Sequence, residues 1–192
     1  MDRIEAAWRA QGAPTADTLA PGLNADQLDA YEAELGCPLP AELRLWWGRH
    51  DGAVGGAWSP GTAAAPRPWF LLSLRESLDE RAERLAANDG AEFSEDDQEW
   101  EGEWASWWLP LATAGNAWIF ADLRAAADGD GSVPVHFYEH VPEDVFRARA
   151  PSLGDLITAW ATAIEQGRFV YSAGSGRWDI PHPLPAELRQ LV

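Results

Sequence analysis

The sequence predicts an α+β domain in which amphipathic helices accompany a mostly antiparallel sheet. Apolar residues recur three and four apart in the first fifty residues and again after residue 150, as they do along the buried face of a helix. Aromatic and aliphatic runs between residues 107 and 138 are separated by glycine-containing turns, which is typical of successive antiparallel strands. No internal repeat or long polar linker divides the chain, so we expect residues 1–192 to form one domain.

Charge limits the partners that this domain can bind. The chain carries 31 acidic and 14 basic residues, which gives a formal net charge of -17 at pH 7, and every basic residue is an arginine. A nucleic-acid backbone binds to clustered positive charge, so nucleic acid is not expected as a partner. Hydrophobic residues make up 46% of the chain, which indicates that the acidity belongs to the surface of a folded domain.

Two helices are predicted before residue 37. Ile4 and Trp8 lie four apart, on one face of a first helix that Gly12 ends. Asn24 and the glutamine three residues later form a capping pair for a second helix. Leucine and tyrosine then recur at helical spacing until Gly36 provides the C-terminal stop.

A third helix, a strand and a fourth helix are predicted next. Pro40 fits the first turn of a helix because its missing N–H would be unpaired there, and this helix ends near Gly52. Residues 52–68 are rich in glycine, proline and alanine, so they are expected to form an irregular connection. A buried strand is predicted to start at Trp69, and residues 73–87 are expected to be helical.

Strands dominate the prediction for the second half of the chain. The expected strands are 107–111, 117–123, 133–138 and 145–148. The clearest turn between them is Asp-Gly-Asp-Gly at residues 128–131. Ser152 begins a helix with one apolar stripe, which Gly167 ends. Residues 168–192 are treated as a C-terminal extension, with a last helical turn starting at Pro185.

Several short motifs occur in the order of a known family. The first runs from the end of one helix to the start of the next through Leu35-Gly36 and Leu39-Pro40, and a later one is the Trp-Trp-Leu-Pro-Leu run that starts at Trp107. The matching segments are residues 32–44, 50–52, 107–111, Gly115, 121–123, 129–131 and 150–153. Their joint order over residues 20–165 resembles the SUKH superfamily of the Smi/Knr type.

This resemblance implies helices packed on one face of a mostly antiparallel sheet of about five to six strands. Bacterial members of the superfamily are mainly immunity proteins that bind and neutralise toxins, often nucleases. Fungal relatives act as interaction proteins in cell-wall signalling, and the family offers no catalytic residues to carry over. We therefore expect a non-catalytic protein-binding module, in the first place an immunity protein for a toxin domain with a basic surface.

The acidic stretch at residues 92–103 is the predicted docking segment, together with an open face of the sheet. A cluster of carboxylates speeds the encounter with a cationic partner, and interleaved tryptophans would supply apolar anchors. Asp122 is added from the resemblance alone, at a family position of undefined role. The predicted partner-binding residues are Asp96, Asp97, Glu99, Trp100, Glu101, Glu103, Trp104 and Asp122. The alternative is a solvated loop that only keeps the protein soluble.

Twelve tryptophans are many for one domain of this length. Some lie on predicted buried faces and are expected to fill the core: Trp8, Trp46, Trp118 and Trp160. Others lie in predicted loops and are candidates for exposed anchors: Trp58, Trp100, Trp104 and Trp178.

No complete catalytic or metal-binding motif is found. Asp128, Asp130, Ser132 and Glu139 fit part of a calcium-loop template, but valine stands where that loop needs glycine, so a turn is the better interpretation. His136 and His140 would lie about 13 Å apart along a strand, too far to share one metal ion. His50 and Asp51 precede a glycine at a helix end, where a turn explains them. We expect no metal, no cofactor and no enzymatic activity.

The expected location is the cytoplasm. No apolar run approaches the ~20 residues that span a bilayer, residues 1–5 do not resemble a secretory signal, and Cys37 is the only cysteine, which fits a reducing compartment. Two other functions remain open. One is a scaffold or regulatory interaction module with an endogenous partner, and the other is a small-ligand sensor or enzyme with an aromatic pocket. The oligomeric state is left open.

Overall fold

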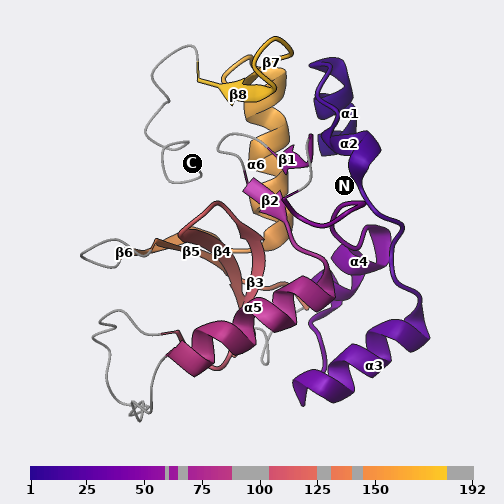
Figure 1. The fold of residues 1–192 in the computed structure, drawn as a ribbon, viewed down its shortest axis with the longest axis vertical. Helices are drawn as coiled ribbons and strands as arrows, with labels where there is room; N and C mark the ends of the chain where they lie inside the picture. Colours follow the sequence, from indigo (N-terminus) through magenta and orange to yellow (C-terminus); the bar gives the residue numbers. More distant parts are fainter. Residues whose placement is uncertain (59–60, 65–68, 88–103, 125–130, 140–144, 181–192) are drawn as a thin grey trace.

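The sheet at the centre of the domain has six antiparallel strands in the order β1-β2-β3-β4-β5-β6, so each strand pairs with its neighbours in sequence (Figure 1). The computed structural model describes residues 1–58, 61–64, 69–87, 104–124, 131–139 and 145–180. The strands are β1 Ala63–Ala64, β2 Trp69–Leu71, β3 Trp108–Thr113, β4 Ala117–Asp122, β5 Val135–Glu139 and β6 Val145–Ala150. The predicted α+β class, with its mostly antiparallel sheet, is confirmed.

The helices predicted up to residue 167 are present, and the one expected to end near Gly52 ends at Arg49. They are α1 Asp2–Ala10, α2 Thr15–Thr18, α3 Ala25–Leu35, α4 Ala41–Arg49, α5 Leu74–Ala87 and α6 Leu153–Glu165. Asn24 and Gln27 form a reciprocal capping box at the start of α3, and Gly36 ends that helix with a φ of 84°. The Ser152 side chain accepts a hydrogen bond from the backbone N–H of Asp155 at the start of α6. The four-residue helix α2 was not predicted from the sequence.

The C-terminal extension contains a hairpin that the sequence did not predict. Strands β7 Val170–Ser172 and β8 Arg177–Asp179 pair beside the C-terminal end of α6 (Figure 1). Trp178 is buried in the hairpin, and its indole Nε1 donates to the Ala63 carbonyl at 3.3 Å. The prediction that Trp178 is an exposed anchor is therefore wrong, because this hydrogen bond ties it to β1. The helical turn expected at Pro185 lies outside the described residues.

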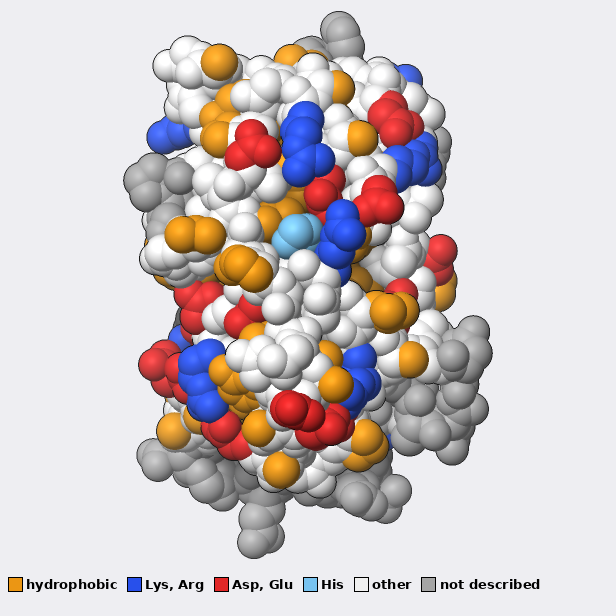
Figure 2. Space-filling view, turned by 90° about the vertical axis from the view of Figure 1, so that its right-hand side faces the viewer, with side chains coloured by type: hydrophobic (Ala, Val, Ile, Leu, Met, Phe, Trp, Pro, Cys, Tyr) orange, Lys and Arg blue, Asp and Glu red, His pale blue; other side chains and the backbone are white. Residues whose placement is uncertain are grey.

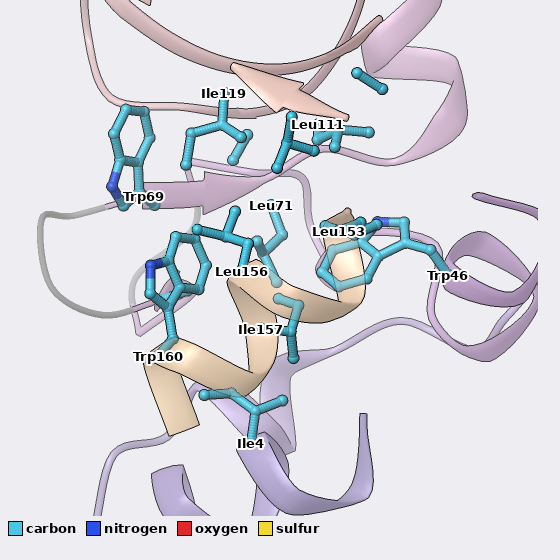
Figure 3. Packing of buried hydrophobic residues seen from close by; sticks show 14 of the residues in the cluster. Ile4, Trp46, Trp69, Leu71, Leu111, Ile119, Leu153, Leu156, Ile157 and Trp160 are labelled. Atoms are coloured by element: carbon cyan, nitrogen blue, oxygen red, sulfur yellow. The ribbon is translucent and has the colours of Figure 1, made fainter. Parts of the chain in front are cut away.

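The main core lies between one face of the sheet and the helices α1, α4 and α6. The apolar stripe of α6 points toward this face, and Figure 3 shows Leu156, Ile157 and Trp160 against side chains of β2, β3 and β4. Helix α1 packs along α6 and adds Ile4 and Trp8. Burying each such large side chain contributes about 1.5–3 kcal/mol, so this cluster supplies most of the drive to fold. The predicted burial of Trp8, Trp46 and Trp160 is confirmed.

Strand β4 is buried on both faces. Its alternate residues Ile119 and Ala121 belong to the main core, whereas Trp118 and Phe120 point to the opposite face. There they form a second cluster, which we call the aromatic cluster: Trp104, Ala105, Trp108, Trp118, Phe120 and Tyr138. Helix α5 gives Leu74 to the main core and packs Leu85 against the aromatic cluster. The predicted burial of Trp118 is confirmed, and the residue is buried in the aromatic cluster instead of the main core.

Candidate functional site

Most of the predicted docking segment falls in a part of the chain that the structure does not describe. These residues are Asp96, Asp97, Glu99, Trp100, Glu101 and Glu103. The described chain stops at Ala87, at the end of α5, and resumes at Trp104. The predicted contacts of the acidic stretch therefore stay predictions, and the structure defines only the two positions from which the stretch departs.

Trp104 lies at the centre of the aromatic cluster. Its ring meets those of Trp108, Trp118, Phe120 and Tyr138 edge-on, with centroids 5.5, 6.1, 5.2 and 5.7 Å away. Such pairs add about 0.5–1.5 kcal/mol each beyond the burial of their surface. Only 3% of Trp104 is exposed, so the prediction that it is an exposed anchor is wrong. The burial of Trp104 could not be predicted from the sequence, because the residue directly follows an acidic run that has neither strand nor helix periodicity.

The expectation of an open sheet face is also wrong for strands β3 to β5. Trp118, Phe120 and Tyr138 project from the face opposite the main core, and all three are buried under Trp104 and the end of α5. Within the described residues, this face is therefore covered by the chain itself.

Asp122 ends β4 and is held by its own turn. Its Oδ1 accepts a hydrogen bond from the backbone N–H of Arg124 at 3.0 Å, and its backbone N–H donates to the Pro134 carbonyl at 3.0 Å. Burial lowers the pKa of His136, and the nearby charge of Asp122 offsets part of that effect. Only 9% of Asp122 is exposed. Its two hydrogen bonds give it a structural role at the end of β4. Whether it contacts a partner stays a prediction.

Cationic side chains flank the aromatic cluster on two sides. The Arg84 guanidinium lies over the Trp118 ring at 4.4 Å and pairs with Glu80 at 3.0 Å. Arg124 lies over the Trp107 ring at 4.3 Å. Each contact holds its arginine on an aromatic face, where a cation–π interaction contributes about 0.5–2 kcal/mol. These arginines are therefore already engaged within the domain.

A second candidate surface is an open groove between α4 and the first half of α6, with a volume of about 210 Å³. Its apolar lining comes from both helices and the start of the chain: Met1, Leu45, Trp46, Leu153 and Ile157. Trp46, Leu153 and Ile157 also belong to the main core, and Figure 3 shows them side by side. Leu45 lies on the rim and is 74% exposed. Sequence reasoning missed this groove because it joins residues more than a hundred positions apart.

Glu42 closes one end of the groove and fastens α4 to α6. Its Oε2 accepts from the backbone N–H groups of Val133 at 2.9 Å and Leu153 at 3.1 Å, and its Oε1 accepts from Gly154 at 2.6 Å. A carboxylate at the N-terminus of α6 also meets the positive end of the helix dipole. Gly154 fits closely here, because a Cβ at this position would lie 2.9 Å from Glu42 Oε1.

The family model for SMI1 / KNR4 (SUKH-1) matches residues 22–159. This stretch runs from just before α3 into α6 and includes all six strands of the main sheet. The chain belongs to the SMI1 / KNR4 family. The predicted resemblance to the SUKH superfamily is thereby confirmed, although a comparison with curated proteins found no significant match.

The SUKH-1 match contains the aromatic cluster and most of the groove. Glu42, Leu45 and residues 153–158 lie within it, whereas α1 and the β7–β8 hairpin lie outside. The buried aromatic cluster and most of the groove are thus built on elements that the family model covers.

In this SUKH-1 domain, His50 and Asp51 are held by different partners. The His50 ring nitrogens lie 3.1 Å from the Ala20 carbonyl and 3.1 Å from Glu5 Oε1. Asp51 instead accepts the backbone N–H of Leu74 at 2.7 Å, at the start of α5. Burial raises the pKa of Asp51, and the charge of Glu76 adds to that effect. Each side chain therefore joins a different pair of elements.

The described part of the SUKH-1 domain contains no group of three or more His, Cys, Asp and Glu residues that could hold a metal ion. None of its described helices has both the length and the apolar character that a membrane span requires. Trp58 is 59% exposed, with its ring 4.5 Å from that of Phe70, so its predicted exposure is confirmed.

Proposed function

We propose that this SUKH-1 protein is a non-catalytic binding module that acts in the cytoplasm as an immunity protein and neutralises a toxin domain with a basic surface. The observation that carries the proposal is the family match over residues 22–159. The net charge of -17 supports a basic partner, because charge complementarity steers association and disfavours acidic competitors.

The acidic stretch is proposed as the first contact with the toxin. Its carboxylates would raise the rate of encounter by about 10- to 1,000-fold at low salt. Trp104 is proposed to contribute as the buried base from which the stretch departs, and Asp122 lies at the end of the neighbouring strand. The bound module would then cover the toxin's active cleft without performing any chemistry.

The proposal is tested by a tagged pull-down from the source organism, washed at low and at high salt, with the bound proteins identified by mass spectrometry. A basic toxin domain is expected to be retained. Its activity should be lost when the chain is added in equimolar amount. Recovery of a housekeeping protein instead would favour a scaffold, and a rise in melting temperature with a nucleotide or metal ion would favour a ligand sensor.

The docking segment has its own test. The charge reversal of Asp96, Asp97, Glu99 and Glu101 to lysine should slow association with the toxin about tenfold or more at low salt and flatten its salt dependence, because it removes the steering field. Stopped-flow fluorescence measures both quantities. The matched control reverses four acidic residues in α3 and α5, namely Asp26, Asp29, Asp79 and Glu83. Equal association rates for the two variants would dismiss the acidic stretch as the docking segment.

A further inference from the structure

We propose that the groove between α4 and α6 binds a basic segment of the protein partner, which inserts one large apolar side chain between Leu45 and Ile157. The inference rests on the proposed function in that it takes the ligand to be a protein. It adds a second contact surface, made of described residues and separate from the acidic stretch.

The apolar lining of the groove is already in place to receive a side chain. Its floor consists of Trp46, Leu153 and Ile157, which the main core fixes from behind. A site whose walls do not need to be ordered on binding loses less entropy when it is occupied. The volume of about 210 Å³ is sufficient for one leucine, methionine or phenylalanine side chain.

Leu45 is the strongest sign that something covers this face. It has the largest exposed fraction, 74%, among the large hydrophobic side chains of the described residues. It projects from α4 beside an apolar hollow, so an inserted side chain would contact it and the floor together. Removing such a side chain from water stabilises the complex in proportion to the apolar surface that is buried.

The charge at the Glu42 end of the groove selects a basic segment. Acidic side chains of α1, α3 and α6 are matched by arginines in the pairs Arg49–Asp2, Arg44–Asp29 and Arg3–Glu165. Figure 2 shows acidic and basic side chains next to one another on the side of α1, α3 and α4. Glu42 and Asp155 differ, because among the described residues they accept only N–H and hydroxyl hydrogen bonds and pair with no cation.

The positive end of the α6 dipole offsets only part of the charge of these two carboxylates, so net negative charge is left where the groove meets the N-terminus of α6. A lysine or arginine next to the inserted apolar residue would neutralise it. A second copy of this chain fits less well, since each copy carries a net charge of -17 and a symmetric contact would bring like charges together.

The test uses a defined probe. The ¹⁵N-labelled chain is titrated with the peptide acetyl-Lys-Lys-Leu-Lys-Lys-amide at low salt, and amide shifts are followed by NMR. We expect saturable shifts at Leu45, Gly154 and Thr158. The peptides acetyl-Glu-Glu-Leu-Glu-Glu-amide and acetyl-Lys-Lys-Ser-Lys-Lys-amide should each bind at least about fivefold more weakly, since one lacks the charge and the other the apolar side chain.

Two variants assign the binding to the groove. Leu45→Ser should weaken the leucine peptide about fivefold and Asp155→Asn about threefold, whereas Val54→Ser, a matched change of an exposed apolar residue outside the groove, should leave it unchanged. Circular dichroism checks that all three variants fold. Equal binding of the acidic peptide, shifts confined to other surfaces, or an equal loss in Val54→Ser would overturn the inference.

The inference and the proposed function can fail separately. Toxin neutralised normally by Leu45→Ser, with no peptide shifts at the groove, would overturn the groove and leave the immunity function standing. If the peptide bound specifically to the groove but the chain neutralised no toxin, the immunity function would be overturned and the groove inference would stand. Sedimentation velocity completes the test, because a dimer of the parent chain that Leu45→Ser dissociates would make the groove a self-association surface and overturn the proposal.

Discussion

The two apolar clusters lie on opposite faces of one sheet and are built in different ways. The main core combines aliphatic side chains and tryptophans from all six helices with the sheet. The aromatic cluster is small, consists almost entirely of rings, and is closed by residues 104–107 and the end of α5. The main core follows from helix and strand periodicity, whereas the aromatic cluster depends on a run of tryptophans without regular spacing. The acidic stretch therefore joins the described fold at Trp104, in the buried aromatic cluster.

The most damaging change is expected in the main core. Trp160→Ala should lower the free energy of unfolding by about 3–5 kcal/mol, because it leaves a large cavity between α6 and the sheet. Urea denaturation followed by circular dichroism measures this loss. If the variant fails to fold, Ile157→Val, with an expected loss of about 1 kcal/mol, provides the measurement. If Trp160→Ala lost less stability than Trp104→Ala in the aromatic cluster, the ranking of the two clusters would be reversed.

The aromatic cluster should be the second most sensitive region. Trp104→Ala should cost about 2–4 kcal/mol, since the ring contacts four aromatic neighbours but lies near the edge of the fold. The control Trp58→Ala removes an exposed tryptophan and should cost under about 1 kcal/mol. Similar values for Trp104 and Trp58 would mean that the aromatic cluster adds little to stability.

On the main-core side, the Glu42 carboxylate also joins α4 to the start of α6 through hydrogen bonds. Glu42→Gln should cost about 1–3 kcal/mol, because an amide is a weaker acceptor for three backbone N–H groups and its NH₂ would face one of them. Hydrogen exchange should rise at Leu153 and Gly154 before it rises in the aromatic cluster. Uniform exchange changes across the domain would contradict a local role for Glu42.

The two regions should respond to acid in different pH windows. Burial lowers the pKa of His136 below its ordinary 6.5, beside the aromatic cluster. The folded state then binds this proton less tightly than the unfolded state, so stability should fall as pH drops below about 6.5.

Glu5, beside the main core, is expected to act at lower pH. Burial raises its pKa, but the hydrogen bond from His50 and the charges of His50 and Arg49 outweigh this and bring it below 4.5. This stabilisation is present above pH 4.5 and is lost as pH falls through the folded pKa. Urea denaturation across pH 3–8 should show that His136→Gln reduces the upper slope and Glu5→Gln the lower one. Glu34 and Glu165, whose pKa values are lowered by hydrogen bonds from Arg75 and Arg3, also contribute to the lower slope. A single slope that neither variant alters would refute the assignment.

Most of the fold could be predicted because the signals are local. Asn24 and Gln27 cap α3, Ser152 begins α6, and the continuous apolar run of β4 marks a buried strand. The β7–β8 hairpin was missed because each strand has only three residues and its burial depends on Trp178 reaching Ala63. Such a contact leaves no local trace in the sequence.

The candidate site was less predictable for the same reason. The burial of Trp104 depends on rings from three strands, and the groove needs α4 and α6 to meet. The role of Glu42 depends on backbone groups 91 to 112 residues away. Exposure of Trp58 could be predicted because it lies between glycines and prolines, where little can pack over it.

The attachment of α5 to β3 has a consequence for how this protein can evolve. The Ser77 hydroxyl donates to the Pro110 carbonyl and Arg81 donates to the Ser106 carbonyl, so the flanks of residues 88–103 are joined independently of that stretch. Doubling the length of a connection between fixed ends costs only about 0.6 kcal/mol. Mutation can therefore lengthen, shorten or recharge this stretch at little cost to the scaffold, and descendants can change their recognition repertoire while inheriting the same sheet.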